Sequence, residues 1–173
     1  MHELLPKATR FAVLVDPANA TLTGYTSKAT KEAARALGVD ALLFNASTRA
    51  EIDAAFAAFG RERTDALFIA GEAFFYSRAV QLATLAVRDR LPASYPSREM
   101  VEAGLLMSYG ANLPEVYRQV GVYTGSILKG AKPADLPVLQ STKLEFVINL
   151  QTARSLNLDI PPTLLARADE VIE

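Results

Sequence analysis

The sequence contains no cysteine and no tryptophan, and its only histidine is His2. Without cysteine the chain can form no disulfide, no thiolate nucleophile and no cysteine-based zinc site. A single histidine close to the amino terminus also cannot complete a Ser-His-Asp or Cys-His arrangement. The composition therefore argues against the common forms of nucleophilic catalysis, and we predict no catalytic residue.

An excess of charge of one sign and long apolar runs are also missing. Eighteen Lys and Arg residues face nineteen Asp and Glu residues, so no basic stripe is available for a phosphate backbone and we expect no nucleic-acid partner. No segment is apolar enough to span a bilayer, and residues 1–10 hold no apolar run typical of a signal peptide. The sequence taken as a complete gene product thus predicts a cytoplasmic chain.

Short apolar runs separated by alanine-rich segments are the main pattern that is present. Half of the 173 residues are hydrophobic, which suits one globular domain with a substantial core. Strands are predicted at residues 11–15, 40–44, 66–70, 91–95, 136–139 and 144–148. Most of these runs alternate with helical segments, as in βαβ units. We therefore predict an α/β fold, a three-layer Rossmann-like parallel sheet.

Capping residues and glycines set the expected ends of the helices. Ser47 or Thr48 begins one helix, with Glu51 completing a capping box to Thr48, and Gly60 ends it. Ser77 is expected to cap the following helix. The predicted helices cover residues 23–37, 48–60, 77–90, 112–130, 149–156 and 161–168.

Residues 104–137 depart from the repeating pattern. They predict a strand, a tight turn and a helix capped by Asn112, with Glu115 three residues later. Apolar and small side chains fall on one face of that helix: Leu113, Val116, Tyr117, Val120, Thr124, Ile127 and Leu128. Gly121 and Gly125 lower the helix propensity, so we expect another backbone to approach closely there.

Candidate binding residues follow the strands, because parallel sheets bind ligands beyond the carboxyl ends of their strands. The loops after the first, third and fourth strands combine aromatic rings with carboxylates and an amide, which suits a small, partly apolar ligand. The candidate ligand-binding residues are Asp16, Asn19, Glu72, Phe74, Phe75, Tyr76, Ser77, Tyr95, Ser97 and Glu99.

Each candidate also has a purely structural interpretation. Asp16 with Pro17 is an ordinary strand-ending turn, and Arg98 with Glu99 could be a solvated ion pair. Phenylalanines usually belong to a core, but three consecutive aromatic residues cannot all point inward. No GxGxxG or GxxxxGK[ST] motif occurs, so we predict no nucleotide cofactor and no metal site.

Four segments together resemble the carboxyl-terminal half of ABC transporter substrate-binding proteins of the tryptophan/tyrosine-binding type. They are PKATRFAVLVDPAN, LLFNASTRAEIDAAF, GLLMSYGANLPEVYRQVGVYTGSILKGAKPADLPV and KLEFVINLQTARSLNLDIPPTLLARADEVIE. The resemblance implies one lobe of a type I periplasmic binding protein, whose two Rossmann-like lobes close on a small molecule. It divides the chain into a ligand-binding lobe (6–104), a hinge-crossing strand and helix (105–137), and return strands with terminal helices (138–173).

The function implied by the resemblance is that of a truncated solute-binding component of an ABC importer. The expected location is periplasmic, the expected partner is a permease, and the expected ligand is an amino acid or an aromatic or organic acid. Amino-acid-binding relatives carry an acidic and amide pair in the third-strand loop, whereas Glu72 is the only carboxylate of AGEAFFYS here. With one lobe alone, ligand binding should be weak.

Two other functions and one assembly remain as hypotheses. A lobe of this architecture also serves in sensory or regulatory effector domains. A carboxylate-dependent α/β enzyme could use Asp16 with Glu72. Because the resemblance leaves the helix at residues 113–128 without its neighbouring lobe, we expect that helix either to fold back onto its own sheet or to pack against a second copy, and we favour a homodimer with exchanged or paired helices.

Overall fold

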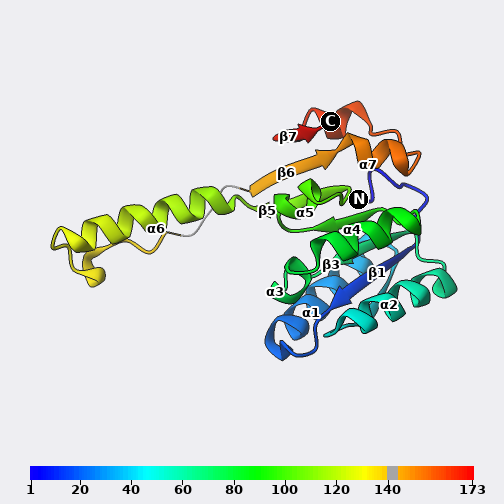
Figure 1. Cartoon of the computed structure of the whole chain (residues 1–173), viewed down its shortest axis with the longest axis horizontal. Helices are drawn as coiled ribbons and strands as arrows, with labels where there is room; N and C mark the ends of the chain where they lie inside the picture. Colours follow the sequence, from blue (N-terminus) through cyan, green and yellow to red (C-terminus); the bar gives the residue numbers. More distant parts are fainter. Residues whose placement is uncertain (140–143) are drawn as a thin grey trace.

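A computed structural model describes residues 1–139 and 144–173 and contains a single mixed sheet (Figure 1). Its strands are β1 Arg10–Val15, β2 Asp40–Asn45, β3 Ala66–Ile69, β4 Ala93–Tyr95, β5 Met107–Ala111, β6 Leu144–Asn149 and β7 Glu170–Ile172, in the order β2-β1-β3-β4-β5-β6-β7. All neighbouring strands are parallel except β5 and β6. The three-layer α/β prediction is confirmed, and the antiparallel β5–β6 pair is its one departure from a parallel sheet.

Helices cover both faces of this sheet. They are α1 Ala20–Leu37, α2 Arg49–Glu62, α3 Ala73–Tyr76, α4 Ala79–Arg88, α5 Arg98–Glu102, α6 Leu113–Leu128, α7 Leu150–Ser155 and α8 Pro162–Leu165, with a 3-10 turn η1 Pro133–Asp135. Phe56 of α2, Leu82 of α4 and Met100 of α5 belong to the same core cluster as Ile69 of β3. On the opposite face, α7 and α8 cover Ile148 of β6 in a smaller cluster.

Two predicted helix ends are wrong. Helix α2 runs through Gly60 to Glu62 and ends at Arg63, which adopts a left-handed φ of 53°. Ser77 does not begin a long helix but ends the short α3, where its hydroxyl donates to the carbonyl of Phe74 at 2.7 Å. A separate helix, α4, follows. The break falls at Arg78, the N-cap of α4, whose φ of −114° and ψ of 20° are not helical.

The carboxyl-terminal third also differs from the prediction. Residues 136–139, expected as a strand, form no strand in the structure. The last helix, expected to reach residue 168, ends at Leu165, and the three-residue strand β7 follows it. The two asparagine caps are confirmed: Asn112 accepts from the Glu115 amide and Asn149 from the Thr152 amide, both at 2.9 Å.

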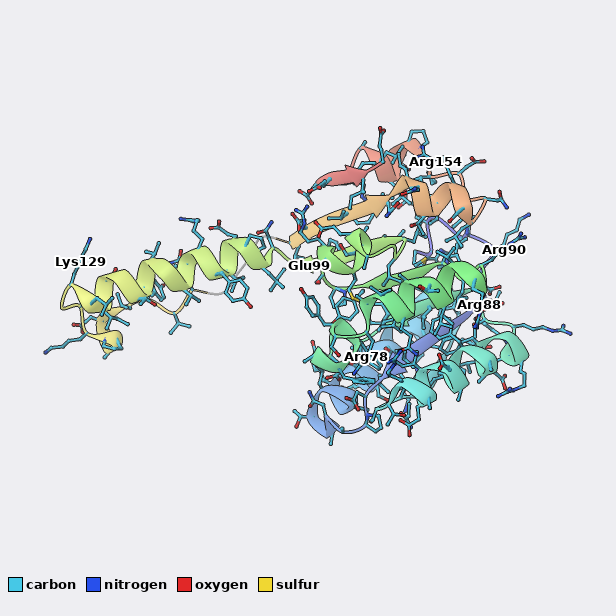
Figure 2. The ribbon with its side chains drawn as sticks, viewed as in Figure 1. Arg78, Arg88, Arg90, Glu99, Lys129 and Arg154 are labelled. Atoms are coloured by element: carbon cyan, nitrogen blue, oxygen red, sulfur yellow. The ribbon has the colours of Figure 1, made fainter. Side chains whose placement is uncertain are left out.

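Helix α6 and the described residues that return from it, 113–139, project away from the sheet as an arm (Figure 1). Lys129 lies near the far tip of the arm, and Glu99 lies where the arm leaves the body (Figure 2). No residue of α6 is buried. The helix therefore does not fold back onto its own sheet. Among the described residues, a side chain at Gly121 or Gly125 would meet nothing within 4 Å outside the backbone of α6 itself, so no described segment makes the expected close backbone approach.

Candidate functional site

Asp16 ends the first strand and is held by its own chain. Its carboxylate accepts from the backbone amide of Ala18 at 3.0 Å and from the hydroxyl of Ser47. Its carbonyl accepts from the hydroxyl of Thr23 at 2.7 Å. Asp16 is buried. These bonds join the loop after β1 to the loop after β2 and to the first turn of α1, so Asp16 shapes the site.

Glu72 and Asn19 meet across two loops. The Asn19 side-chain amide donates to Oε2 of Glu72 at 3.0 Å, while its side-chain oxygen caps α1 by accepting from the Leu22 amide at 3.2 Å. Glu72 is 3% exposed, and its second oxygen, Oε1, is buried without a hydrogen-bond partner among the described residues. The structure thus places the carboxylate of Glu72 beside the side-chain amide of Asn19, and only one of the two carboxylate oxygens accepts a hydrogen bond from the described residues.

The electrostatics of Glu72 follow from this environment. Burial raises the pKa of Glu72 above the usual 4.5; the Asn19 hydrogen bond lowers it, and the nearby negative charge of Asp16 raises it further. Tyr95, the last residue of β4, donates its hydroxyl to the carbonyl of Glu72 at 3.0 Å. Burial, followed by the charge of Glu72, raises the pKa of Tyr95 to about 12. Tyr95 therefore binds the backbone of Glu72 and not its carboxylate, whose Oε1 accepts no hydrogen bond from the described residues.

The three aromatic residues after β3 point in different directions. Phe75 is fully buried in the core, which removes it from the candidate binding surface. Phe74 is half-buried, and the Arg78 guanidinium carbon lies 5.8 Å from the centre of its ring. Tyr76 is exposed. The Ser77 hydroxyl donates to a backbone carbonyl of its own turn. Tyr76 and the exposed part of Phe74 therefore form the aromatic surface that a ligand can contact.

The loop after β4 brings Ser97 and Glu99 close to Tyr95. The Ser97 hydroxyl donates to Oε2 of Glu99, and the charge of Glu99 contributes to the raised pKa of Tyr95. The alternative of an Arg98–Glu99 ion pair is wrong, because Arg98 turns to Glu102 at 3.1 Å and to Glu170 at 2.9 Å. The Glu99 side chain thus faces Ser97 and Tyr95, not Arg98.

Pro96 of the same loop lies close to two glycines, and neither contact was predicted from the sequence. A Cβ built on Gly110 of β5 would lie 2.0 Å from the Pro96 carbonyl oxygen, and one on Gly71 would lie 2.9 Å from the Pro96 ring. Glycine inside a strand is a signal of such close backbone approach. These two contacts tie the ends of β3, β4 and β5 to one another.

The site residues offer no evident metal centre. Within residues 1–139 and 144–173, no group of three or more His, Cys, Asp or Glu side chains could hold a metal ion. Over the same residues, no helix has the length and apolar character needed to cross a membrane. What the site offers is a buried carboxylate, an amide, a tyrosine and an aromatic rim, a set suited to non-covalent contacts.

Comparison with protein families gives one match that covers almost the whole chain. The model described as ABC transporter substrate binding protein matches residues 1–172. None of the curated protein sequences matches the chain.

Three solved structures share the fold. A conserved domain protein from Vibrio cholerae O1 biovar El Tor is 25% identical with a TM-score of 0.85, and the match covers 98% of this chain and 57% of that one. The ABC domain in complex with L-Trp from Streptococcus pneumonia is 24% identical with a TM-score of 0.85, covering 99% and 59%. CD0873, a substrate binding protein with adhesive properties from Clostridium difficile in its ligand-free, open form, is 21% identical with a TM-score of 0.70, covering 99% and 58%. The chain thus spans less than two thirds of each.

Proposed function

The chain belongs to the ABC transporter substrate binding protein family, and from that premise we propose that it binds a small solute, without catalysis, beyond the carboxyl ends of β1, β3 and β4. The observation that carries this proposal is the hydrogen bond from Asn19 to Glu72, which joins an amide and a carboxylate from the loops after β1 and β3. Open parallel sheets bind their ligands beyond these strand ends.

The chemistry of the site favours a ligand with a cationic or hydrogen-bond-donating group. An ammonium group would meet the carboxylate of Glu72, and Asn19 would keep that carboxylate oriented. An apolar or aromatic part of the ligand would lie against Tyr76 and the free part of Phe74. Amino acids, including aromatic ones, combine these two features, and they are the ligand class we propose.

Transport is the wider role that we propose from family membership. The protein would act outside the cytoplasmic membrane and deliver its solute to an ABC permease. Since the chain spans 57–59% of the three solved structures, we propose that the opposite wall of the site comes from elsewhere in a longer protein. This chain alone would then enclose one side of the ligand and bind it weakly.

Isothermal titration calorimetry with a panel of amino acids and aromatic acids tests the proposal. We expect weak binding that Glu72→Gln abolishes, with Glu62→Gln, an exposed carboxylate on α2, as the matched control. Binding of a cationic ligand should also weaken as the pH falls through the raised pKa of Glu72, because protonation removes the charge. Unchanged binding by Glu72→Gln, or no ligand in the panel, would contradict the proposed site.

The other two hypotheses have less support in the geometry. An enzyme using Asp16 with Glu72 would need both carboxylates free to act, but that of Asp16 already accepts from Ala18 and Ser47. The regulatory hypothesis uses the same ligand site, and it differs from transport only in the partner that responds to the ligand.

A further inference from the structure

The arm begins beside the loop that follows β4. We refer to residues 96–99, which belong to the candidate site, as the β4 loop. A Cβ on Gly110 of β5 would lie 2.0 Å from the Pro96 carbonyl oxygen, so the two backbones are in contact without an intervening side chain. Asn112, the N-cap of α6, follows Gly110 closely and is the root of the arm. Figure 2 likewise shows Glu99 of the β4 loop where the arm leaves the body.

The carboxylate of Glu145 lies between the root of the arm and the β4 loop. Glu145 belongs to β6, where it pairs with Gly110. Its Oε1 accepts a hydrogen bond from the side-chain amide of Asn112 at 2.9 Å. The same Oε1 lies 3.6 Å from Nη1 of Arg98, a residue of the β4 loop, and the side chain of Glu145 is only 13% exposed. One shielded oxygen thus contacts both the root of the arm and the β4 loop.

Asn112 is held at both ends of its side-chain amide. Its oxygen accepts from the Glu115 backbone amide at 2.9 Å and so caps α6, while its Nδ2 donates to Glu145. Turning the amide over would place its NH2 group against the Glu115 N–H and its oxygen against a carboxylate, and both contacts would be repulsive. Glu145 therefore selects the amide orientation that caps the first turn of the arm.

Arg98 connects Glu145 to the candidate site. Its neighbours in the chain are Ser97 and Glu99, whose side chains are hydrogen-bonded to each other. The Arg98 guanidinium also pairs with Glu170 of β7 at 2.9 Å, and its side chain is 26% exposed. Charges that are partly shielded from water attract each other more strongly than exposed charges do. A displacement of this guanidinium would therefore move the backbone between two residues of the site.

We propose that Glu145 is a positioning residue that couples the root of the arm to the β4 loop of the solute site. A movement of Asn112 would displace Glu145 and, through the ion pair, Arg98. Coupling between two sites is reciprocal, so a solute that orders the β4 loop would also favour the capped form of α6. The inference deepens the proposed function, since it rests on the β4 loop being part of the site that binds the solute.

Amide hydrogen exchange tests this coupling without any ligand. The reporter amides are those of Met100 and Ala103, which donate to carbonyls of the β4 loop. We expect Asn112→Ala to speed their exchange about 2-fold, which is less than its effect within α6. In a Glu145→Ala background the coupling is already lost, so Asn112→Ala should add nothing at the reporter amides. An unchanged exchange rate in Asn112→Ala, or the same increase in both backgrounds, would overturn the proposal.

Glu170→Ala is the matched control. Glu170 also pairs with Arg98, but none of the described hydrogen bonds joins it to Asn112. In a Glu170→Ala background, Asn112→Ala should therefore still speed exchange at the reporter amides.

A conservative variant separates coupling from a purely structural role. Glu145→Gln keeps an oxygen that can accept from Asn112, but it removes the charge that attracts Arg98. We expect α6 to keep its protection in this variant, while the reporter amides no longer respond to Asn112→Ala. Equal loss of protection in α6 and in the β4 loop would give Glu145 a structural role only and would overturn the proposal.

The coupling and the proposed function can fail separately. If the unmodified chain binds no solute in calorimetry, the proposed function is contradicted. The exchange measurements contain no solute, so they decide in either case whether Glu145 couples the arm to the β4 loop.

Discussion

The body and the arm of this molecule are stabilised in different ways. In the body, the last four residues of β1, from Ala12 to Val15, are almost completely buried, and Phe56 of α2 and Leu82 of α4 share a core cluster with Ala12 and Leu14. In the arm, α6 has no buried residue. The body is therefore stabilised by its buried apolar core. The arm has no core of its own and depends on local hydrogen bonds, ion pairs and any surface that covers it.

The side-chain bonds described within the arm lie at the surface. Arg118 forms an ion pair with Glu115, and Tyr123 donates its hydroxyl to the carbonyl of Pro137 at 2.6 Å. Exposed pairs of this kind contribute about 0.2–1 kcal/mol each. Isolated helices below about 12–15 residues are marginal in water, and α6 is only slightly longer. The arm should therefore be the first part of the chain to open.

Truncating one large aromatic residue in each region gives the largest expected difference. Phe56→Ala should lower the free energy of unfolding by about 3–5 kcal/mol, because it leaves a cavity in the core. Tyr117→Ala in the arm should change it by less than about 0.5 kcal/mol at concentrations where the chain is monomeric. Urea denaturation followed by circular dichroism measures both. Similar losses for the two variants would contradict the comparison.

A glycine-to-alanine substitution should lower stability in the body and raise it in the arm. Gly110→Ala forces a methyl group into the Pro96 carbonyl and should cost about 1–3 kcal/mol or more. Gly121→Ala meets nothing within 4 Å inside a helix and should stabilise the arm by about 0.5–1 kcal/mol. Thermal unfolding and the helical signal of each variant distinguish the outcomes. A stable Gly110→Ala protein would show that the loop at Pro96 can move away from β5 at little cost in free energy.

Local and periodic features of the fold could be predicted from the sequence. The apolar runs at residues 11–15 and 66–70 became β1 and β3, and the caps at Asn112 and Asn149 formed as expected. These features depend on residues only a few positions apart. Strand β7 has three residues, too few for a periodic pattern, and it forms only because β6 provides its partner.

The geometry of the site depends on contacts that no local pattern reveals. Asn19 and Glu72 are 53 positions apart and come from the loops after β1 and β3, so their hydrogen bond could not be recognised from the sequence. The loop residues themselves could be predicted, because strand ends define where ligands bind. Which of Phe74, Phe75 and Tyr76 faces the core is decided by packing, and only the structure reveals that Phe75 does.

Removing one asparagine cap from each region tests the comparison on a smaller scale. Asn149→Ala in the body should cost about 1–3 kcal/mol, because its buried amide also donates to the Val101 carbonyl at 3.1 Å. Asn112→Ala in the arm should cost about 1 kcal/mol for the lost cap, and it also removes the hydrogen bond that the Asn112 amide donates to Glu145 of β6 at 2.9 Å. Hydrogen exchange should place the second loss mainly in residues 113–128. Faster exchange throughout the body in Asn112→Ala would mean that arm and body unfold together.

The smallest expected effect is a change in the pH dependence of stability caused by Glu72. Burial raises the pKa of this carboxyl in the folded state above its value in the unfolded chain, so the folded state binds the proton more tightly. Stability contributed by Glu72 therefore falls as the pH rises from the unfolded pKa to the folded pKa, and is constant above it. Glu72→Gln removes the charge while retaining an oxygen that can accept from Asn19. The variant should gain stability relative to the unmodified chain across that acid range, as measured by denaturation at a series of pH values. Glu62→Gln should show no such trend, and parallel curves for Glu72→Gln and the unmodified chain would mean that the buried carboxylate is already satisfied.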